Sequence, residues 1–167
     1  MPKCLLLCDP GGRLPALAPA LEHAGCDVAR ADGDAESFCA READGLALIG
    51  AGEGCWRALL LAERYPVERL ALIGCPLRPR APSPLRRRAE RDLFSVVCDL
   101  LIVQPLSDAS MLPRGADVLL RCVHSRERRR VDMGGDFADL WTEHEQWLTR
   151  ELLRFLGGEY NAKTLAK

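Results

Sequence analysis

The stretch that decides the fold is Leu46-Ala47-Leu48-Ile49-Gly50-Ala51-Gly52-Glu53-Gly54-Cys55-Trp56-Arg57-Ala58-Leu59. It begins with an apolar run of strand length and ends with apolar residues at helical spacing. Between the two stand glycines at alternate positions, 50, 52 and 54. Glycine is favoured where a backbone turns sharply or another segment approaches closely. The stretch therefore predicts a buried strand, a tight turn and a helix.

Apolar runs of strand length alternate with stretches of helical period along the rest of the chain. The other predicted strands are residues 3–8, 26–31, 70–74, 100–104 and 128–133. The predicted helices are one carrying Leu14, Leu17 and Leu21 on one face, one from Gly54 to just before Pro66, 115–122, and a continuous helix over 137–156. This alternation predicts an α/β fold: a three-layer α/β/α sandwich around a mostly parallel sheet of about six strands. Residues 1–156 are expected to form one domain and 157–167 a flexible C-terminal tail.

Composition excludes several classes of protein. The chain has 167 residues, 23 basic and 24 acidic side chains, and a hydrophobic share of 48%. This balance is typical of a folded globular protein and argues against a nucleic-acid partner. No apolar run reaches the roughly 20 residues that span a bilayer, so no membrane partner is expected. The N-terminus lacks the features of a signal peptide, which predicts a cytoplasmic protein.

The eight cysteines form no C-x-x-C pair, so structural zinc is not expected. Most lie in apolar runs and are predicted to be buried thiols in a reducing compartment. Residues 76–91 interleave prolines with arginines. We interpret them as a solvated, proline-stiffened loop, with an anion-binding or acidic-partner patch as the alternative.

Two families combine a strand, a glycine turn and a helix. The dinucleotide-binding fingerprint G-x-G-x-x-G requires a third glycine where this chain has Cys55, and an acidic residue at the end of the next strand. That strand ends Leu72-Ile73-Gly74-Cys75 and offers no carboxylate for a ribose. The dinucleotide reading is therefore disfavoured.

The second family fits over nearly the whole chain. Residues 50–74 resemble, without a gap, the nucleophile elbow, its helix and the next strand of the α/β-hydrolases, of the small esterase and acyl-hydrolase type. Residues 5–12 resemble their first strand and oxyanion loop, residues 98–120 the segment that carries the triad acid, and residues 133–136 the segment that carries the triad histidine. The resemblance spans about residues 3–156 and implies an α/β-hydrolase-like fold. Between residues 74 and 100 the chain is too short for a cap domain.

The same resemblance implies that the catalytic machinery is degenerate. Gly52 stands where the serine nucleophile belongs, Asp136 stands where the histidine belongs, and Asp108 alone matches the triad. The oxyanion loop has Cys8 and Asp9 where the family has His-Gly. Acyl transfer by this route needs a nucleophile with a base beside it, and glycine supplies neither. The chain's histidines are expected in structural or surface roles: His23, His124 and His144.

Two routes to residual catalysis are open. Reading the elbow one residue later makes Glu53 a nucleophile, with Asp108 or Asp136 as its partner, which gives a divergent hydrolase of a small ester or thioester. A cysteine nucleophile, Cys55 or Cys75, is less favoured because neither residue stands at the apex of the turn.

A binding role is the preferred interpretation. Backbone N–H groups at a glycine turn that opens a helix suit an anion. Carboxylates gathered at the strand ends would recruit Mg²⁺ or Ca²⁺, or would hydrogen-bond to nearby backbone; we prefer the second, so neither metal nor cofactor is predicted. The candidate ligand-binding residues are Asp9, Gly11, Gly12, Glu53, Asp108 and Asp136.

The sequence thus predicts a catalytically degenerate α/β-hydrolase-like protein with a ligand-binding, regulatory or interaction role. Its expected partners are a small-molecule ligand in the vestigial cleft and a second copy of itself. Without a cap, apolar surface around the cleft would be covered by a homodimer contact. The predicted rim of that contact is Trp56, Leu77, Met111 and Leu112.

Overall fold

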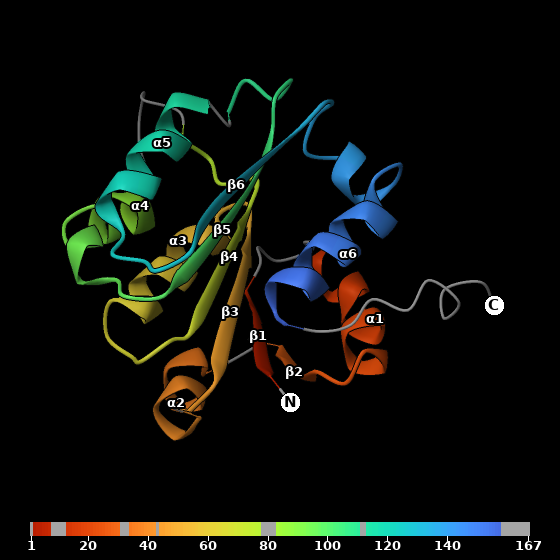
Figure 1. Ribbon diagram of the computed structural model, residues 1–167. Coiled ribbons are helices and arrows are strands. Elements are labelled where there is room, and N and C mark those ends of the chain that lie inside the picture. The colour runs from red at the N-terminus through yellow and green to blue at the C-terminus, as the bar shows by residue number, and fades with distance from the viewer. Residues whose placement is uncertain are drawn as a thin grey trace.

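The computed structural model contains a sheet whose neighbouring strands all run parallel (Figure 1). It describes residues 2–7, 13–30, 34–42, 44–77, 83–110 and 113–157. The strands are β1 (Lys3–Leu7), β2 (Asp27–Arg30), β3 (Leu46–Ala51), β4 (Arg69–Ile73), β5 (Asp99–Pro105) and β6 (Arg128–Met133). Their order across the sheet is β2-β1-β3-β4-β5-β6. Each lies within two residues of the strand predicted from the sequence.

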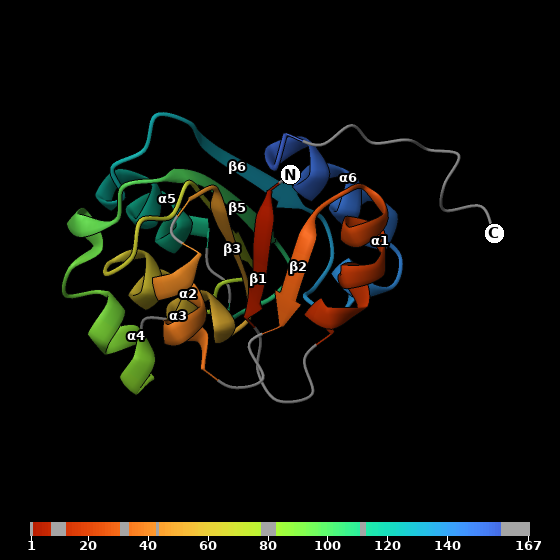
Figure 2. The same ribbon diagram turned by 90° about the horizontal axis from the view of Figure 1, so that it is seen from below.

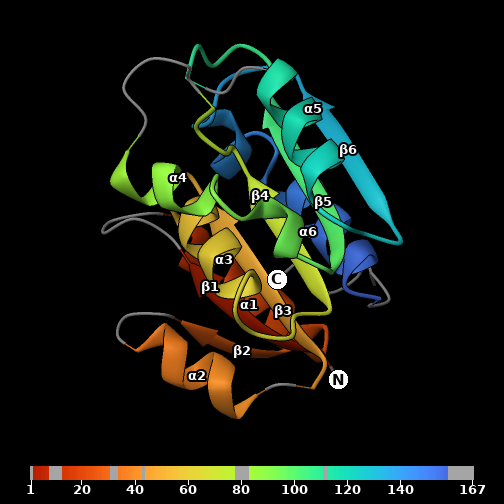
Figure 3. The ribbon, with the colours of Figure 1, turned by 90° about the vertical axis from the view of Figure 1, so that its left-hand side faces the viewer.

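Helices cover both faces of this sheet. On one face lie α1 (Ala18–His23), which follows the 3-10 turn η1 (Leu14–Leu17), and α6 (Glu145–Phe155) (Figures 1 and 2). The other face carries α2 (Ala35–Arg41), α3 (Gly54–Ala62), α4 (Pro84–Ala89), the 3-10 turn η2 (Leu93–Ser95) and α5 (Pro113–Cys122), as Figure 3 shows. The predicted three-layer α/β/α sandwich is confirmed.

The core follows the alternation of side chains along each strand. In β1, Leu5 and Leu7 pack on the α3 side, whereas Cys4 and Leu6 pack on the side of α1 and α6. Every residue of β3 is buried, because this strand lies inside the sheet with helices on both faces. The described cysteines are free thiols, buried apart from the partly exposed Cys122, as the sequence predicted.

The arginine-rich stretch departs from the expectation of a loop, because its second half forms α4. Ser83 caps this helix: its hydroxyl accepts a hydrogen bond from the Arg86 backbone N–H at 3.2 Å. Pro84 occupies the first turn, where the missing N–H costs nothing. Arginines at positions 86–88 face the negative end of the helix dipole. Pro84 therefore marks a helix start, which the prediction of a solvated loop overlooked.

Two further elements differ from the prediction. The expected continuous helix over 137–156 is divided into η3 (Asp139–Trp141) and α6, because Thr142 (φ −125°, ψ −79°) leaves the helical region. Helix α2 was not predicted from the sequence. Its N-cap is Asp34, whose carboxylate accepts a hydrogen bond from the Ser37 N–H at 3.0 Å.

The end of the chain is described as far as Gly157, just after α6. The predicted tail beyond it lies outside the described residues, so the domain limits stay a prediction. Within the described part of the chain, no helix has the length and apolarity needed to cross a membrane.

Candidate functional site

The turn between β3 and α3 has the geometry of a tight elbow. Gly52 lies at its tip with φ +56°, a left-handed conformation that L side chains rarely adopt. Its N–H donates a hydrogen bond to the Ile73 carbonyl in β4 at 3.0 Å, and its carbonyl accepts one from the Cys55 N–H at 3.1 Å. The tip is thus bound to the neighbouring strand on one side and to the first turn of α3 on the other.

Gly50, the first glycine of the motif, is required by a close contact with the backbone of α3. A Cβ atom built on Gly50 would stand 2.8 Å from the Cys55 Cα and 2.8 Å from the Gly54 carbonyl oxygen. Side chains do not fit so close to rigid backbone, so only glycine allows α3 to begin directly over the end of β3. The glycines of G-A-G-E-G therefore allow β3 and α3 to cross at close distance.

The elbow lies at the switch point of the sheet. The chain leaves β1 for β2 on one side, and then crosses to β3 on the other side of β1. In open parallel sheets, the carboxyl ends of the strands at such a point form the usual ligand site. The loop after β1 carries the predicted Asp9, Gly11 and Gly12, which lie outside the described residues.

Asp108 follows β5 at the same edge of the sheet. One of its carboxylate oxygens accepts hydrogen bonds from the Ser110 N–H at 2.8 Å and from the Ser110 hydroxyl at 2.6 Å. This is an Asx turn, a local arrangement that stabilises the loop. The carboxylate is therefore engaged with its own loop.

Asp136 follows β6 and is engaged in the same way. Its Oδ1 accepts hydrogen bonds from the Ala138 N–H at 2.8 Å and the Asp139 N–H at 3.2 Å. Its loop lies directly beside the loop of Asp108, because the Ser107 N–H donates to the Gly135 carbonyl at 2.9 Å. The fold brings these two loops together, and each carboxylate hydrogen-bonds within its own loop.

Glu53 is held by the N-cap residue of α4, the helix that forms where a loop was expected. Its Oε2 accepts a hydrogen bond from the Ser83 hydroxyl at 2.8 Å. Next to it, the Arg86 guanidinium carbon lies 5.4 Å from the centre of the Trp56 ring, a cation–π distance. Helix α4 therefore packs on the first turn of α3, beside the elbow. The N-cap pattern Ser83-Pro84 is the sequence signal that could have located it.

The two cysteines considered as nucleophiles are buried side by side behind the elbow. The Cys55 thiol donates to the Gly50 carbonyl at 3.3 Å, and neither cysteine exposes any surface. Burial raises the pKa of the Cys75 thiol well above its usual range, and the contact with Cys55 raises it further. A neutral, inaccessible thiol is a poor nucleophile.

The predicted dimer rim is wrong for Trp56 and Leu77, the two rim residues that the structure describes, because neither is exposed. Trp56 is fully buried and Leu77 is buried as well, since both pack in the core between the sheet and helices α3 and α5. Met111 and Leu112 lie outside the described residues. The most exposed large apolar side chains in the described part of the chain are instead Phe94 and Val97.

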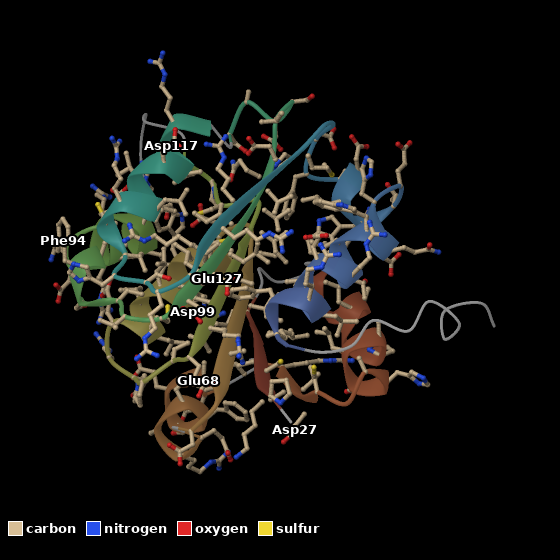
Figure 4. The ribbon with its side chains drawn as sticks, in the orientation of Figure 1. Asp27, Glu68, Phe94, Asp99, Asp117 and Glu127 are labelled. Atoms are coloured by element: carbon tan, nitrogen blue, oxygen red, sulfur yellow. The ribbon has the colours of Figure 1, made fainter. Side chains whose placement is uncertain are left out.

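These two residues belong to the opposite edge of the sheet, at the amino ends of β4 to β6. Figure 4 shows Phe94 at the margin of the molecule, and Glu68, Asp99 and Glu127 along this edge. A cavity of about 440 Å³ opens here; its lining includes Val97, Asp99 and His124. The ring Nδ1 of His124 lies 3.1 Å from the Phe94 carbonyl, which is a structural role.

The other two histidines lie at helix ends. His23 ends α1, and His144 precedes α6, where its backbone N–H donates to the Asp139 carbonyl at 3.0 Å. Within the described ranges, no group of three or more His, Cys, Asp or Glu side chains is arranged to hold a metal ion.

Comparisons with known proteins define the fold. No protein-family model matches the sequence, and no curated protein matches it either. Solved structures do match. The monoacylglycerol lipase of Paleococcus ferrophilus superposes with a TM-score of 0.74 at 14% identity, over 92% of this chain and 93% of the lipase.

Two further structures have the same architecture. The esterase domain of a Rhodothermus marinus protein gives a TM-score of 0.61 at 17% identity, over 89% of this chain and 86% of that domain. MGS-M2, an α/β hydrolase from a Medee basin deep-sea metagenome library, gives 0.68 at 11% identity, over 98% and 92%. With its parallel sheet, its order β2-β1-β3-β4-β5-β6 and its glycine elbow after β3, this chain has the fold of the α/β-hydrolase superfamily.

Proposed function

We propose that this chain is a catalytically degenerate α/β-hydrolase-like protein that binds a small ligand at the elbow without hydrolysing it. The observation that carries the proposal is Gly52, which occupies the tip of the elbow with φ +56°. In the α/β-hydrolases the nucleophile stands at this strained tip. Glycine relieves the strain and removes the nucleophile together.

The environment of Asp136 supports the same conclusion. A hydrolase of this type needs a base that can take a proton from the nucleophile and return it to the leaving group. Here the carboxylate that follows β6 accepts two backbone hydrogen bonds in its own loop. Asp108, engaged with Ser110, has no histidine to orient.

Binding is supported by the backbone of the elbow. Helix α3 begins at Gly54, so the positive end of its dipole faces the carboxyl edge of the sheet. The carbonyl oxygen of an ester or the carboxylate of a product suits this position. The bound ester stays intact because no oxygen or sulfur nucleophile stands at residue 52.

The alternative, a hydrolase that uses Glu53 as nucleophile, receives less support. Glu53 accepts a hydrogen bond from Ser83 and stands one residue past the tip. A regulatory role and a homodimer stay predictions; light scattering at increasing protein concentration tests the dimer directly.

The test combines turnover with localised binding. Wild type, Gly52→Ser, Glu53→Gln and Asp108→Ala are assayed with p-nitrophenyl acetate and p-nitrophenyl butyrate beside a blank without protein. We expect wild type to equal the blank, and Gly52→Ser to equal it too, because the carboxylates of Asp108 and Asp136 hydrogen-bond within their own loops. In amide NMR spectra, the intact butyrate ester should shift the signals of residues 52–54.

Two results would overturn the proposal. Turnover by wild type that Glu53→Gln abolishes would establish the divergent hydrolase instead. If wild type shows neither turnover nor an amide shift near Gly52, the elbow does not bind the ester.

A further inference from the structure

A second cavity lies away from the elbow, between α2, α3 and α4. Its volume is about 210 Å³, and no residue of the 50–54 turn lines it. The three helices that form it lie on the same face of the sheet in Figure 3. The lining residues are Asp34, Ala35, Glu36, Arg57, Leu60, Leu61, Arg64, Leu85 and Arg88.

The charged groups of this cavity are unequally satisfied. The Asp34 carboxylate accepts hydrogen bonds from the Ser37 backbone N–H and hydroxyl, and these hold the pKa of Asp34 below its usual range. The Glu36 carboxylate accepts a hydrogen bond from Arg64 at 3.1 Å. Glu36 is therefore paired with Arg64, whereas Asp34 keeps its charge and hydrogen-bonds to the neutral Ser37. With Arg57, Arg64 and Arg88 against these two carboxylates, the lining keeps an excess of positive charge.

Two guanidinium groups of the lining have no ion-pair partner in the described part of the chain. Neither Arg57 of α3 nor Arg88 of α4 makes an ion pair with any carboxylate in the described part of the chain. The nearby Glu63 carboxyl does not neutralise Arg88 fully, because burial raises its pKa to about 7. Two cations that line one small cavity repel each other, and an anion between them removes that cost.

The remaining walls are apolar. Leu60 and Leu61 of α3 line one side, and Leu85 of α4 lines the other. Leu61 is buried, whereas Leu60 and Leu85 keep exposed surface that a ligand could cover. The cavity is smaller than the roughly 300–1,000 Å³ of sites for drug-sized ligands. It suits a small molecule with one charged end and a short hydrocarbon part.

We propose that this cavity, the α2–α3–α4 pocket, binds a small organic oxyanion whose carboxylate or phosphate lies between Arg57 and Arg88 and whose alkyl part packs on Leu60 and Leu85. Guanidinium groups match both oxyanions because they donate two parallel hydrogen bonds. The site is independent of the elbow and of any hydrolytic activity.

Calorimetric titration with matched probes tests the proposal. Hexanoate and hexyl phosphate carry the oxyanion and the alkyl part, acetate lacks the alkyl part, and hexanol lacks the charge. We expect hexanoate or hexyl phosphate to bind, acetate to bind more weakly, hexanol not to bind, and high salt to weaken binding. Comparison of the first two probes decides between carboxylate and phosphate.

Matched variants locate the site. Arg57→Gln and Arg88→Gln should each weaken hexanoate or hexyl phosphate by about tenfold, the loss of one charge-assisted hydrogen-bonding group. Arg87→Gln is the control, because Arg87 is an exposed neighbour on α4 that does not line the pocket. The melting temperatures should not fall, since neither Arg57 nor Arg88 makes an ion pair in the described part of the chain.

Amide NMR shifts separate this site from the elbow. The oxyanion probes should shift signals in α2, the second half of α3 and α4, and should do so equally in Gly52→Ser. No binding of either oxyanion probe, equal binding by Arg57→Gln and Arg88→Gln, or shifts centred on residues 52–54 would each overturn the proposal. None of these outcomes depends on the ester assay.

Discussion

Asp136 and Asp139 cap each other's backbone. The Asp139 carboxylate accepts a hydrogen bond from the Asp136 N–H at 2.8 Å, and the Asp136 carboxylate accepts one from the Asp139 N–H at 3.2 Å. This reciprocal pair closes the turn that leads from β6 into η3. The residue at the position of the family's catalytic histidine thus takes part in a structural turn.

From this pair we expect a stability effect. Asp136→Ala should lower the free energy of unfolding by about 1 kcal/mol, the usual cost of losing a capping side chain. Asp139→Ala should cost a similar amount, and the double variant less than the sum, because the two caps depend on each other. Urea denaturation measures all three. Full additivity would contradict the coupling.

A second prediction concerns the close crossing at the elbow. Gly50→Ala should destabilise the protein by about 1–3 kcal/mol, because its Cβ would meet backbone atoms at 2.8 Å and α3 would have to move off β3. Gly134→Ala is the matched control, since a Cβ there meets nothing within 4 Å. Thermal unfolding of both variants measures the difference. Equal melting temperatures would mean that the crossing can widen freely.

A third prediction concerns pH. Burial, aided by Asp92, raises the pKa of Glu63 from 4.5 to about 7 in the folded protein, and Oε1 of Glu63 is buried without a hydrogen-bond partner among the described residues. Folding therefore favours the protonated carboxyl. The stability that Glu63 contributes is complete below about pH 4.5 and is lost as the pH rises to about 7.

Glu63→Gln isolates this contribution. The variant should match wild type near pH 4.5 and become more stable than wild type above about pH 7. Denaturant unfolding across this pH range measures the difference in free energy of unfolding between the variant and wild type. Because both proteins share all other titrating groups, the contributions of those groups cancel in this difference. Glu22→Gln, an exposed position on α1, is the control. A difference that is constant with pH would show that Glu63 does not titrate abnormally.

A fourth prediction concerns the attachment of α6 to the edge strand β6. Glu151 is 5% exposed, and its carboxylate accepts hydrogen bonds from Arg129 of β6 at 2.5 Å and from Arg154 at 3.2 Å. Arg129→Met should cost about 1–3 kcal/mol, because it removes the inter-element partner of a buried charge. Arg154→Met should cost less, since Arg154 is largely exposed. Equal costs would argue against a specific role for Arg129.

Much of the fold could be predicted from local sequence patterns. The apolar runs located β1, β3, β4 and β5, because these strands lie inside the sheet, and interior parallel strands need continuous apolar residues. The G-x-G-x-G spacing located the elbow, because Gly50 and Gly52 meet backbone constraints that other residues satisfy poorly. These features depend on neighbours in sequence, so the sequence displays them.

The missed elements depend on partners distant in sequence. Helix α4 is short, and it is stabilised by contacts with α3 through Ser83–Glu53 and Arg86–Trp56. The periodicity over 137–156 continues through Thr142, yet Thr142 leaves the helical conformation and separates η3 from α6. Periodicity identifies the buried face of a segment and does not identify a break within it.

The sequence by itself determined the α/β-hydrolase type of fold and the absence of an oxygen or sulfur nucleophile at residue 52, because both are written in residue types at fixed spacing. Only the tertiary structure decided which groups the carboxylates bind, which cysteines are inaccessible, and that Arg57 and Arg88 line one pocket. The reason is physical: hydrogen bonds, burial and charge proximity are set by the distances between elements, and those distances exist only after the helices have packed on the sheet.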